Sequence, residues 1–169
     1  NEAMLSLTIT PGTDLIILDN EAVADILKIQ HVTDASPLTK FTGQMALGDL
    51  NGTMAIRGVN ANFFGYSGTV AKAGDVFLEN ESGQIVVSEA VLKLFGVQDP
   101  KDIIGKEVSL KIFITSSSVS QSQLEIVDVP TNYIVKGVVE DSQDSYIYMP
   151  LKELASYVKV NSYEQARVK

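Results

Sequence analysis

The chain has 169 residues, of which 45% are hydrophobic and 20% are charged. It is too apolar for a disordered protein, and its length suits one domain or one domain with a smaller lobe. The formal net charge of −8, without any cluster of lysine and arginine, argues against nucleic-acid binding. The chain has no cysteine, which excludes a thiol nucleophile, a cysteine-ligated metal and a disulfide framework.

Hydrophobic periodicity predicts the order β-α-β-β in the first third. Leu5, Leu7 and Ile9 alternate as in a short strand, which a Pro-Gly turn ends. A helix is predicted over 19–30, because Asp19 is a suitable N-cap and apolar residues follow at helical spacing. Residues 36–59 predict two strands joined at GDLNG, where the Asn-Gly pair is typical of a hairpin turn.

The middle third predicts short strands around one helix. Ser88 is expected to cap a two-turn helix over 89–95, and Gly96 to close it at the C′ position. The uncharged segment SSSVSQSQ is expected to be a mobile loop. The expected strands are 74–79, 83–89, 107–115 and 124–129.

The last third repeats the element order of the first. Strands are predicted over 132–140 and 146–149, then a helix with Pro150 near its first position and a further extended segment. The outer thirds therefore look like paired halves of one α/β sandwich, and the middle third like an insertion. The sequence predicts the fold class α+β, with 1–60 and 131–169 forming one subdomain and 61–130 an inserted, mainly-β lobe.

The joins between these two parts are predicted at 59–69 and 128–133. Glycines and a proline at these crossings suit hinge or rigid-body motion. The candidate hinge residues are Gly58, Gly65, Gly68 and Pro130.

Aromatic residues lie beside the first crossing. Phe63, Phe64 and Tyr66 are candidates for lining a cleft between the two parts, although packing in the core or at an interface is the favoured interpretation. Tyr146 and Tyr148 alternate with Ile147, which indicates a surface that forms an interface or merely covers the sheet.

The sequence offers no catalytic constellation. The single histidine, His31, follows a helix end and has no identifiable partner for catalysis. Ser67 in GYSGT lacks the second glycine of a nucleophile elbow. The acidic groups Asp14 with Asp19, and 140–144, lie beside turn residues, where carboxylates favour local backbone bonding.

Cofactor and metal motifs are incomplete as well. Asp49 and Asn51 have the spacing that opens an EF-hand loop, but the downstream glutamate and flanking helices are missing. A chain with one histidine and no cysteine has few suitable ligands for a transition metal. The sequence also contains no glycine-rich phosphate loop. We therefore predict no enzyme activity, no cofactor and no metal.

Six segments occur in an order that resembles one known family. They are AIRGVNANFF, AGDVF, GQIVVSEAVLKLFG, DIIGKEVSLKI, YIVKGVVED and SYIYMPLKEL. This succession is similar to the extracytoplasmic core domain of MacB-type and FtsX-like ABC-transporter permeases, and extends over about residues 5–163. The segment 115–131 departs from the resemblance, because it is longer than the short turn expected there.

The resemblance implies a porter-like subdomain from 1–60 and 131–169 and an inserted Sabre-like lobe from 61–130. It places the domain outside the bacterial cytoplasmic membrane, between the first and second membrane helices. No run of this sequence approaches the roughly 18 apolar residues of such a helix, and no signal peptide opens the chain. Because both ends lie in or beside strand patterns, we expect the chain to be a piece of a longer permease.

The function implied is transmission of ATP-driven conformational change across the membrane, with contact to substrate or partner protein. Export of a peptide or antimicrobial, or lipoprotein handling, would be the process. The implied partners are a cytoplasmic ATP-binding subunit, a second permease copy and an extracytoplasmic partner, with ATP hydrolysis outside this chain. The alternative is a free-standing secreted or surface-anchored ligand-binding or adhesion module.

Overall fold

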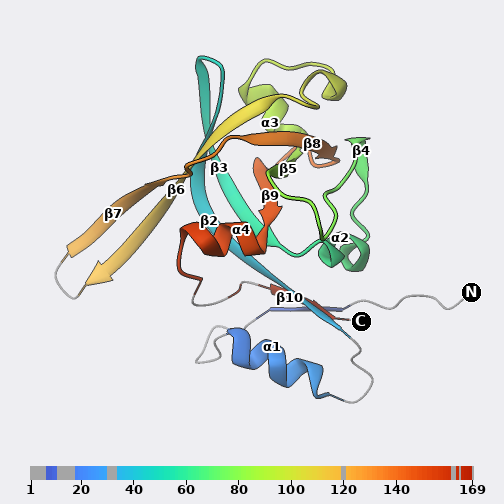
Figure 1. Cartoon of the computed structure of the whole chain (residues 1–169), viewed down its shortest axis with the longest axis vertical. Helices are drawn as coiled ribbons and strands as arrows, with labels where there is room; N and C mark the ends of the chain where they lie inside the picture. The colour runs from blue at the N-terminus through green and yellow to red at the C-terminus, as the bar shows by residue number, and fades with distance from the viewer. Residues whose placement is uncertain are drawn as a thin grey trace, which may run out of the picture.

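The structure is a computed structural model that describes residues 7–10, 18–29, 34–118, 121–160, 163 and 165–168. Figure 1 shows the arrangement of its strands and four α-helices. The helices are α1 (Asn20–Leu27), α2 (Asn62–Ser67), α3 (Glu89–Leu94) and α4 (Leu151–Tyr157), with a 3₁₀ turn η1 (Pro100–Asp102). The strands are β1 (Leu7–Ile9), β2 (Ala35–Leu47), β3 (Leu50–Val59), β4 (Ala71–Gly74), β5 (Gln84–Ser88), β6 (Glu107–Ser118), β7 (Gln121–Asp128), β8 (Tyr133–Val139), β9 (Tyr146–Pro150) and β10 (Gln165–Val168).

The strands form one sheet that closes on itself. Hydrogen-bonded neighbours follow the order β1-β10-β2-β3-β9-β5-β8-β6-β7, and an additional pairing joins β2 to β6. Six strands therefore form a closed ring: β2, β3, β9, β5, β8 and β6. In this ring β3–β9 and β5–β8 are parallel, and the other pairs are antiparallel.

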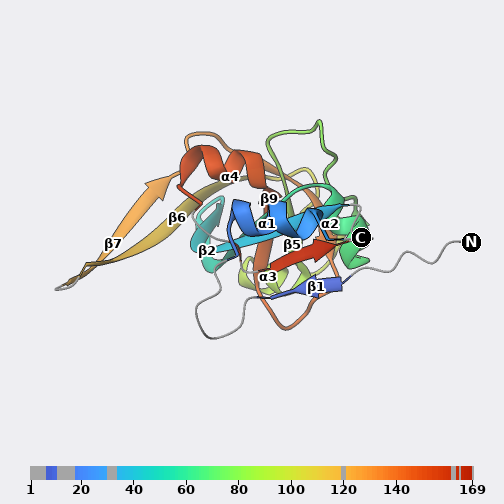
Figure 2. The same cartoon turned by 90° about the horizontal axis from the view of Figure 1, so that it is seen from below.

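Besides β4, which pairs antiparallel with β8, two extensions leave the ring. On one side β10 pairs with β2 and β1 pairs with β10. On the other side β6 and β7 project from the body as a long arm, which both views show (Figures 1 and 2). The exposed side chains of Leu124 and Ile126 lie on this arm, at 63% and 54% exposure. The outer part of the arm lies in the segment 115–131, which departs from the family resemblance.

The period-2 alternation of the strands separates two cores. Ile147 and Met149 of β9 point into the main core, whereas Tyr146 and Tyr148 point to the opposite face. The main core also takes side chains from α3 and α4, and the second core is covered by α2. A third cluster packs α1 against β10 and the start of β2.

Local sequence explains several of the observed boundaries. The carboxylate of Asp19 accepts a hydrogen bond from the backbone N–H of Ala22 at 2.9 Å, which confirms the predicted N-cap of α1. Gly96 follows α3 with φ +65°, as predicted for a C′ glycine. Gly43 allows β2 to lie between β3 and β6, because a Cβ there would be 2.4 Å from the carbonyl oxygen of Lys111.

Three local predictions were wrong. The 36–59 hairpin turns at Gly48-Asp49, where Leu47 pairs with Leu50, so the Asn-Gly pair lies within β3. The strand expected over 74–79 is β4, which ends at Gly74, and the following residues are irregular. The loop expected over 116–123 is largely strand, since β6 continues to Ser118 and β7 begins at Gln121. In addition, the predicted join 59–69 contains the helix α2, for which no helix was predicted.

Most other elements were predicted correctly, including β5, α3, the start of β6, β8, β9 and α4. Pro150 ends β9 and is the N-cap of α4 rather than its first residue. Strand β5, from the predicted insertion, lies between β8 and β9 of the predicted outer subdomain. The functional division into 1–60 with 131–169 and 61–130 stays a prediction.

Candidate functional site

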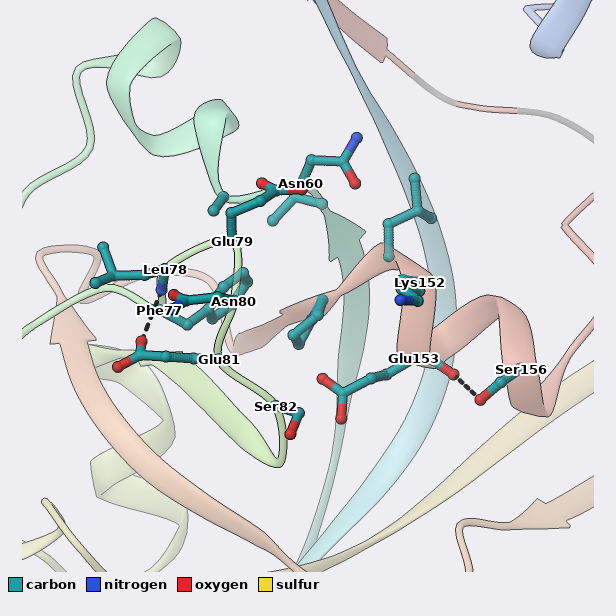
Figure 3. A pocket seen from close by; sticks show the side chains of 14 residues that line it. Asn60, Phe77, Leu78, Glu79, Asn80, Glu81, Ser82, Lys152, Glu153 and Ser156 are labelled. Atoms are coloured by element: carbon teal, nitrogen blue, oxygen red, sulfur yellow. Dashed lines mark hydrogen bonds between the residues drawn. The ribbon is translucent and has the colours of Figure 1, made fainter.

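A cavity of about 360 Å³ lies where the parallel strands β3 and β9 end (Figure 3). Residues 59–61, which close β3, form one part of its wall, and the start of α4 forms another. The loop 77–82 supplies the remaining wall. Crevices beyond the carboxyl ends of parallel strands are common places for ligands.

Two carboxylates hold the loop of this cavity in place. Glu153 of α4 accepts a hydrogen bond from the backbone N–H of Gly83 at 2.9 Å. Glu81 accepts one from the backbone N–H of Leu78 at 2.7 Å and forms an ion pair with Lys136 of β8. These contacts lower the pKa of Glu81, the bond from Lys136 contributing most. The loop is therefore fixed to both α4 and β8.

A buried tyrosine continues this network below the cavity. The hydroxyl of Tyr133 donates to Oε1 of Glu153 at 3.2 Å and lies 2.9 Å from the hydroxyl of Tyr157. Tyr133 has no exposed surface, and this burial raises its pKa well above the ordinary value, with further contributions from Tyr157 and Glu153. The other carboxylate oxygen of Glu153, Oε2, is buried and has no hydrogen-bond partner.

The predicted site aromatics belong mainly to the second core. Phe63 and Phe64 are each 3% exposed and pack in tilted or edge-to-face contacts with Tyr148 at 5.5 and 5.4 Å. Neither lines the cavity. The geometry supports the core-packing interpretation for this pair.

Tyr66 has a different role from the two phenylalanines. Its hydroxyl donates a short hydrogen bond to Asp34, and Asn62 donates to the same carboxylate oxygen at 3.0 Å. Burial and the bond to Asp34 raise the pKa of Tyr66. The three side chains fix α2 to the start of β2.

Contrary to the prediction, Tyr146 and Tyr148 do not lie on the surface, because α2 and its aromatic side chains cover their face of the sheet. They are 6% and 5% exposed. The guanidinium carbon of Arg57 lies 3.7 Å from the ring centroid of Tyr146, in cation–π geometry.

The candidate hinge residues occupy different environments. Gly58 lies within β3, where a Cβ would be 2.6 Å from Cδ2 of Leu154, so the glycine permits close packing of α4. Gly65 is exposed in α2, and Gly68 ends that helix with φ +67°. Pro130 is exposed just after β7. Their role as hinges stays a prediction.

The acidic turn at 140–144 is built by local bonds. The backbone N–H groups of Asp144 and Gln143 each donate to Asp141 Oδ1 at 3.0 Å, and they lower its pKa. Ser88 makes no side-chain cap bond, and its hydroxyl instead donates to the carbonyl of Asp144 at 2.6 Å. His31 and Asp14 lie outside the described residues. Within the described part of the chain, no group of acidic and histidine side chains is arranged to hold a metal ion.

Sequence reasoning missed the cavity and its carboxylate network. Glu81 and Glu153 are ordinary surface-pattern residues in the sequence, and 70 residues separate Gly83 from Glu153. The one available signal was the order of elements, since a strand–Pro–helix unit places residues 150–153 at a strand end.

Comparison with known proteins identifies the fold family. The family of the MacB-like periplasmic core domain matches residues 3–168. No curated protein sequence matches at a significant level. Across the described ranges, no helix has the length and apolar character needed to cross a bilayer.

Solved structures agree with the family match. The periplasmic region of MacB from Actinobacillus actinomycetemcomitans is 20% identical, with a TM-score of 0.68 over 97% of this chain and 73% of that one. The extracellular domain of the ABC-type transporter YknZ from Gram-positive bacteria is 16% identical, with a TM-score of 0.65 over 90% of this chain and 73% of that one. The chain therefore belongs to the family of MacB-like periplasmic core domains, the extracytoplasmic domains of ABC-transporter permeases.

Proposed function

We propose that this domain transmits ATP-driven conformational change across the membrane and moves as one stiff body. The observation that carries the proposal is the closed ring of six strands. Its β2–β6 and β5–β9 pairings join the two predicted parts by backbone hydrogen bonds. Bending between the parts would require those bonds to open, whereas motion of the whole domain would not.

The proposed setting is a full-length permease outside the bacterial cytoplasmic membrane. A cytoplasmic ATP-binding subunit would supply the motion, and a second permease copy would carry the opposing domain. An extracytoplasmic substrate or partner protein would receive the movement, in export or in lipoprotein handling. The family membership supports this assignment.

Distance measurements between spin labels test the proposal in the full-length permease. This chain has no cysteine of its own, so Lys28→Cys, directly after α1, and Glu125→Cys, in β7, each add one exposed attachment point for a label to the domain. We expect the Lys28–Glu125 distance within one copy to stay constant when a non-hydrolysable ATP analogue is added. The Glu125–Glu125 distance between two copies should change. No change between copies would refute transmission, and a change within one copy would refute the stiff body.

A disulfide across the ring provides an independent check. Ala46 of β2 and Ser109 of β6 are direct antiparallel partners, a geometry that suits a disulfide. We expect oxidised Ala46→Cys/Ser109→Cys permease to retain transport and transport-coupled ATPase activity, with the reduced protein and the two single variants as controls. Loss of coupling on oxidation, restored by a reductant, would instead establish that the predicted hinge opens.

A further inference from the structure

We propose that the cavity between the loop 77–82 and α4 binds a cationic group on an aliphatic stem, such as an alkylammonium ion or a basic side chain. This inference goes beyond the transmission function and does not depend on it. The cavity volume of about 360 Å³ is within the range of sites for small ligands. It would hold a butylammonium group together with several waters.

The interior of the cavity suits an aliphatic stem. The apolar lining comes from both strand ends, the loop and α4: Val59, Ala61, Phe77, Leu78, Pro150 and Leu151. Phe77 is 1% exposed and Val59 is fully buried, so this part of the wall belongs to the packed core and keeps its shape.

The charges around the cavity favour a cation. Its lining contains three carboxylates, on Glu79, Glu81 and Glu153, and one ammonium group, on Lys152. Lys136 behind the loop neutralises Glu81. The remaining imbalance is negative, which favours a cationic ligand and disfavours an anion.

Glu153 provides the second observation that points to a ligand. Its carboxylate extends from α4 toward Ser82 of the opposite wall (Figure 3). Oε1 already accepts from Gly83 and Tyr133, whereas the buried Oε2 has no donor. A buried carboxylate oxygen without a donor is unfavourable. An ammonium group at this wall would supply the missing donor to Oε2 while Oε1 keeps its bonds from Gly83 and Tyr133.

The walls are held in place before any ligand arrives. The loop is attached to α4 through Glu153 and to β8 through the Glu81–Lys136 pair. Preorganisation of this kind lowers the entropic cost of binding. The same bonds also mean that a conservative change at Glu153 can remove charge while keeping the acceptor for Gly83.

Backbone amide NMR shifts of the isotope-labelled chain test the proposal, with butylamine, butanol and butyrate as probes of equal stem length. We expect butylammonium to shift the amides of Asn60, Ser82 and Glu153 in a saturable way, and to bind more tightly than the other two. Glu153→Gln should weaken it by about tenfold, the effect of losing one charge-assisted hydrogen bond. Glu79→Gln should weaken it less, and Glu125→Gln on the distant arm should not change it.

Three results would overturn the proposal: equal binding of butanol, tighter binding of butyrate through Lys152, or no saturable shift of the cavity amides by any probe. If the Glu153→Gln variant does not fold, the proposal is still tested by the Glu79→Gln variant and by the comparison of butylamine with butanol and butyrate. Acetyl-Gly-Lys-Gly-amide then distinguishes the source of the cation. Tighter binding than butylamine would support a peptide side chain, and weaker binding would support a small amine. These binding results do not depend on whether the permease moves as proposed.

Discussion

The contact between β4 and β8 predicts an unusually damaging glycine substitution. Gly137 lies opposite Gly74, and a Cβ on Gly137 would be 2.1 Å from the carbonyl oxygen of Asp75. Carbon–oxygen contacts are normally about 3.3 Å or longer, so Gly137→Ala must displace the backbone by roughly 1 Å. The displaced atom is backbone, so rotation of a side chain cannot relieve the contact.

The expected loss follows from two contributions. Overpacking costs about 1–3 kcal/mol, and loss of the 3.2 Å hydrogen bond from Asp75 N–H to the Lys136 carbonyl costs about 1 kcal/mol more. We expect Gly137→Ala to lower the free energy of unfolding by about 3 kcal/mol, or Tm by roughly 6–12 °C in a domain of this size. Urea unfolding followed by circular dichroism measures the change.

Gly65→Ala is the matched control. Gly65 lies in α2, and a Cβ added there would meet no atom within 4 Å, so alanine should raise stability by about 0.5–1 kcal/mol. The reasoning would be refuted if Gly137→Ala unfolded within about 0.5 kcal/mol of the parent chain, the usual scatter for surface substitutions.

Two further predictions concern buried hydroxyls. Ser88→Ala should lower the free energy of unfolding by about 2 kcal/mol, because the carbonyl of Asp144 loses a donor and the buried N–H of Tyr146 loses its acceptor. The substitution Ser109→Ala at an exposed position is the control, and the urea midpoints of both variants measure the difference. Burial raises the pKa of Tyr133 in the folded chain. Its contribution to the free energy of unfolding is therefore fully present below the unfolded-state pKa of about 10, and it is lost as pH rises above that value, by about 1.4 kcal/mol per pH unit. Tyr133→Phe should remove that part of the alkaline slope, and an unchanged slope would contradict the assignment.

Strands and helices with clear periodicity could be predicted from sequence, because their pattern is local. The alternation in β6 and the cap at Asp19 are of this kind. The turn of the β2–β3 hairpin was misplaced because two glycine-containing pairs lie within five residues, and Leu47–Leu50 pairing selects the first. The helix α2 was missed because its glycines indicate a break, whereas packing of Phe63 and Phe64 on Tyr148 stabilises it.

Long-range contacts could not be predicted in the same way. Closure of the ring depends on β2–β6 pairing, for which neither strand carries a recognisable signal. The sequence places Tyr146 and Tyr148 on a surface because it does not show that α2 folds over them. The cavity is in the same class, since Glu81, Lys136 and Glu153 come from three elements that meet only in the folded chain.

The antiparallel pairing of β1 with β10 also has a mechanical consequence. Leu7 is opposite Val168, so a load applied outward through these two residues acts first on one end of a short ladder. Hydrogen bonds in such a ladder lie perpendicular to the strands. A load on one end of the ladder therefore breaks these hydrogen bonds sequentially and not all at once. Tension between the two ends would therefore peel β1 away at low force and leave the ring intact, whereas a push shared by both ends would reach the ring undiminished.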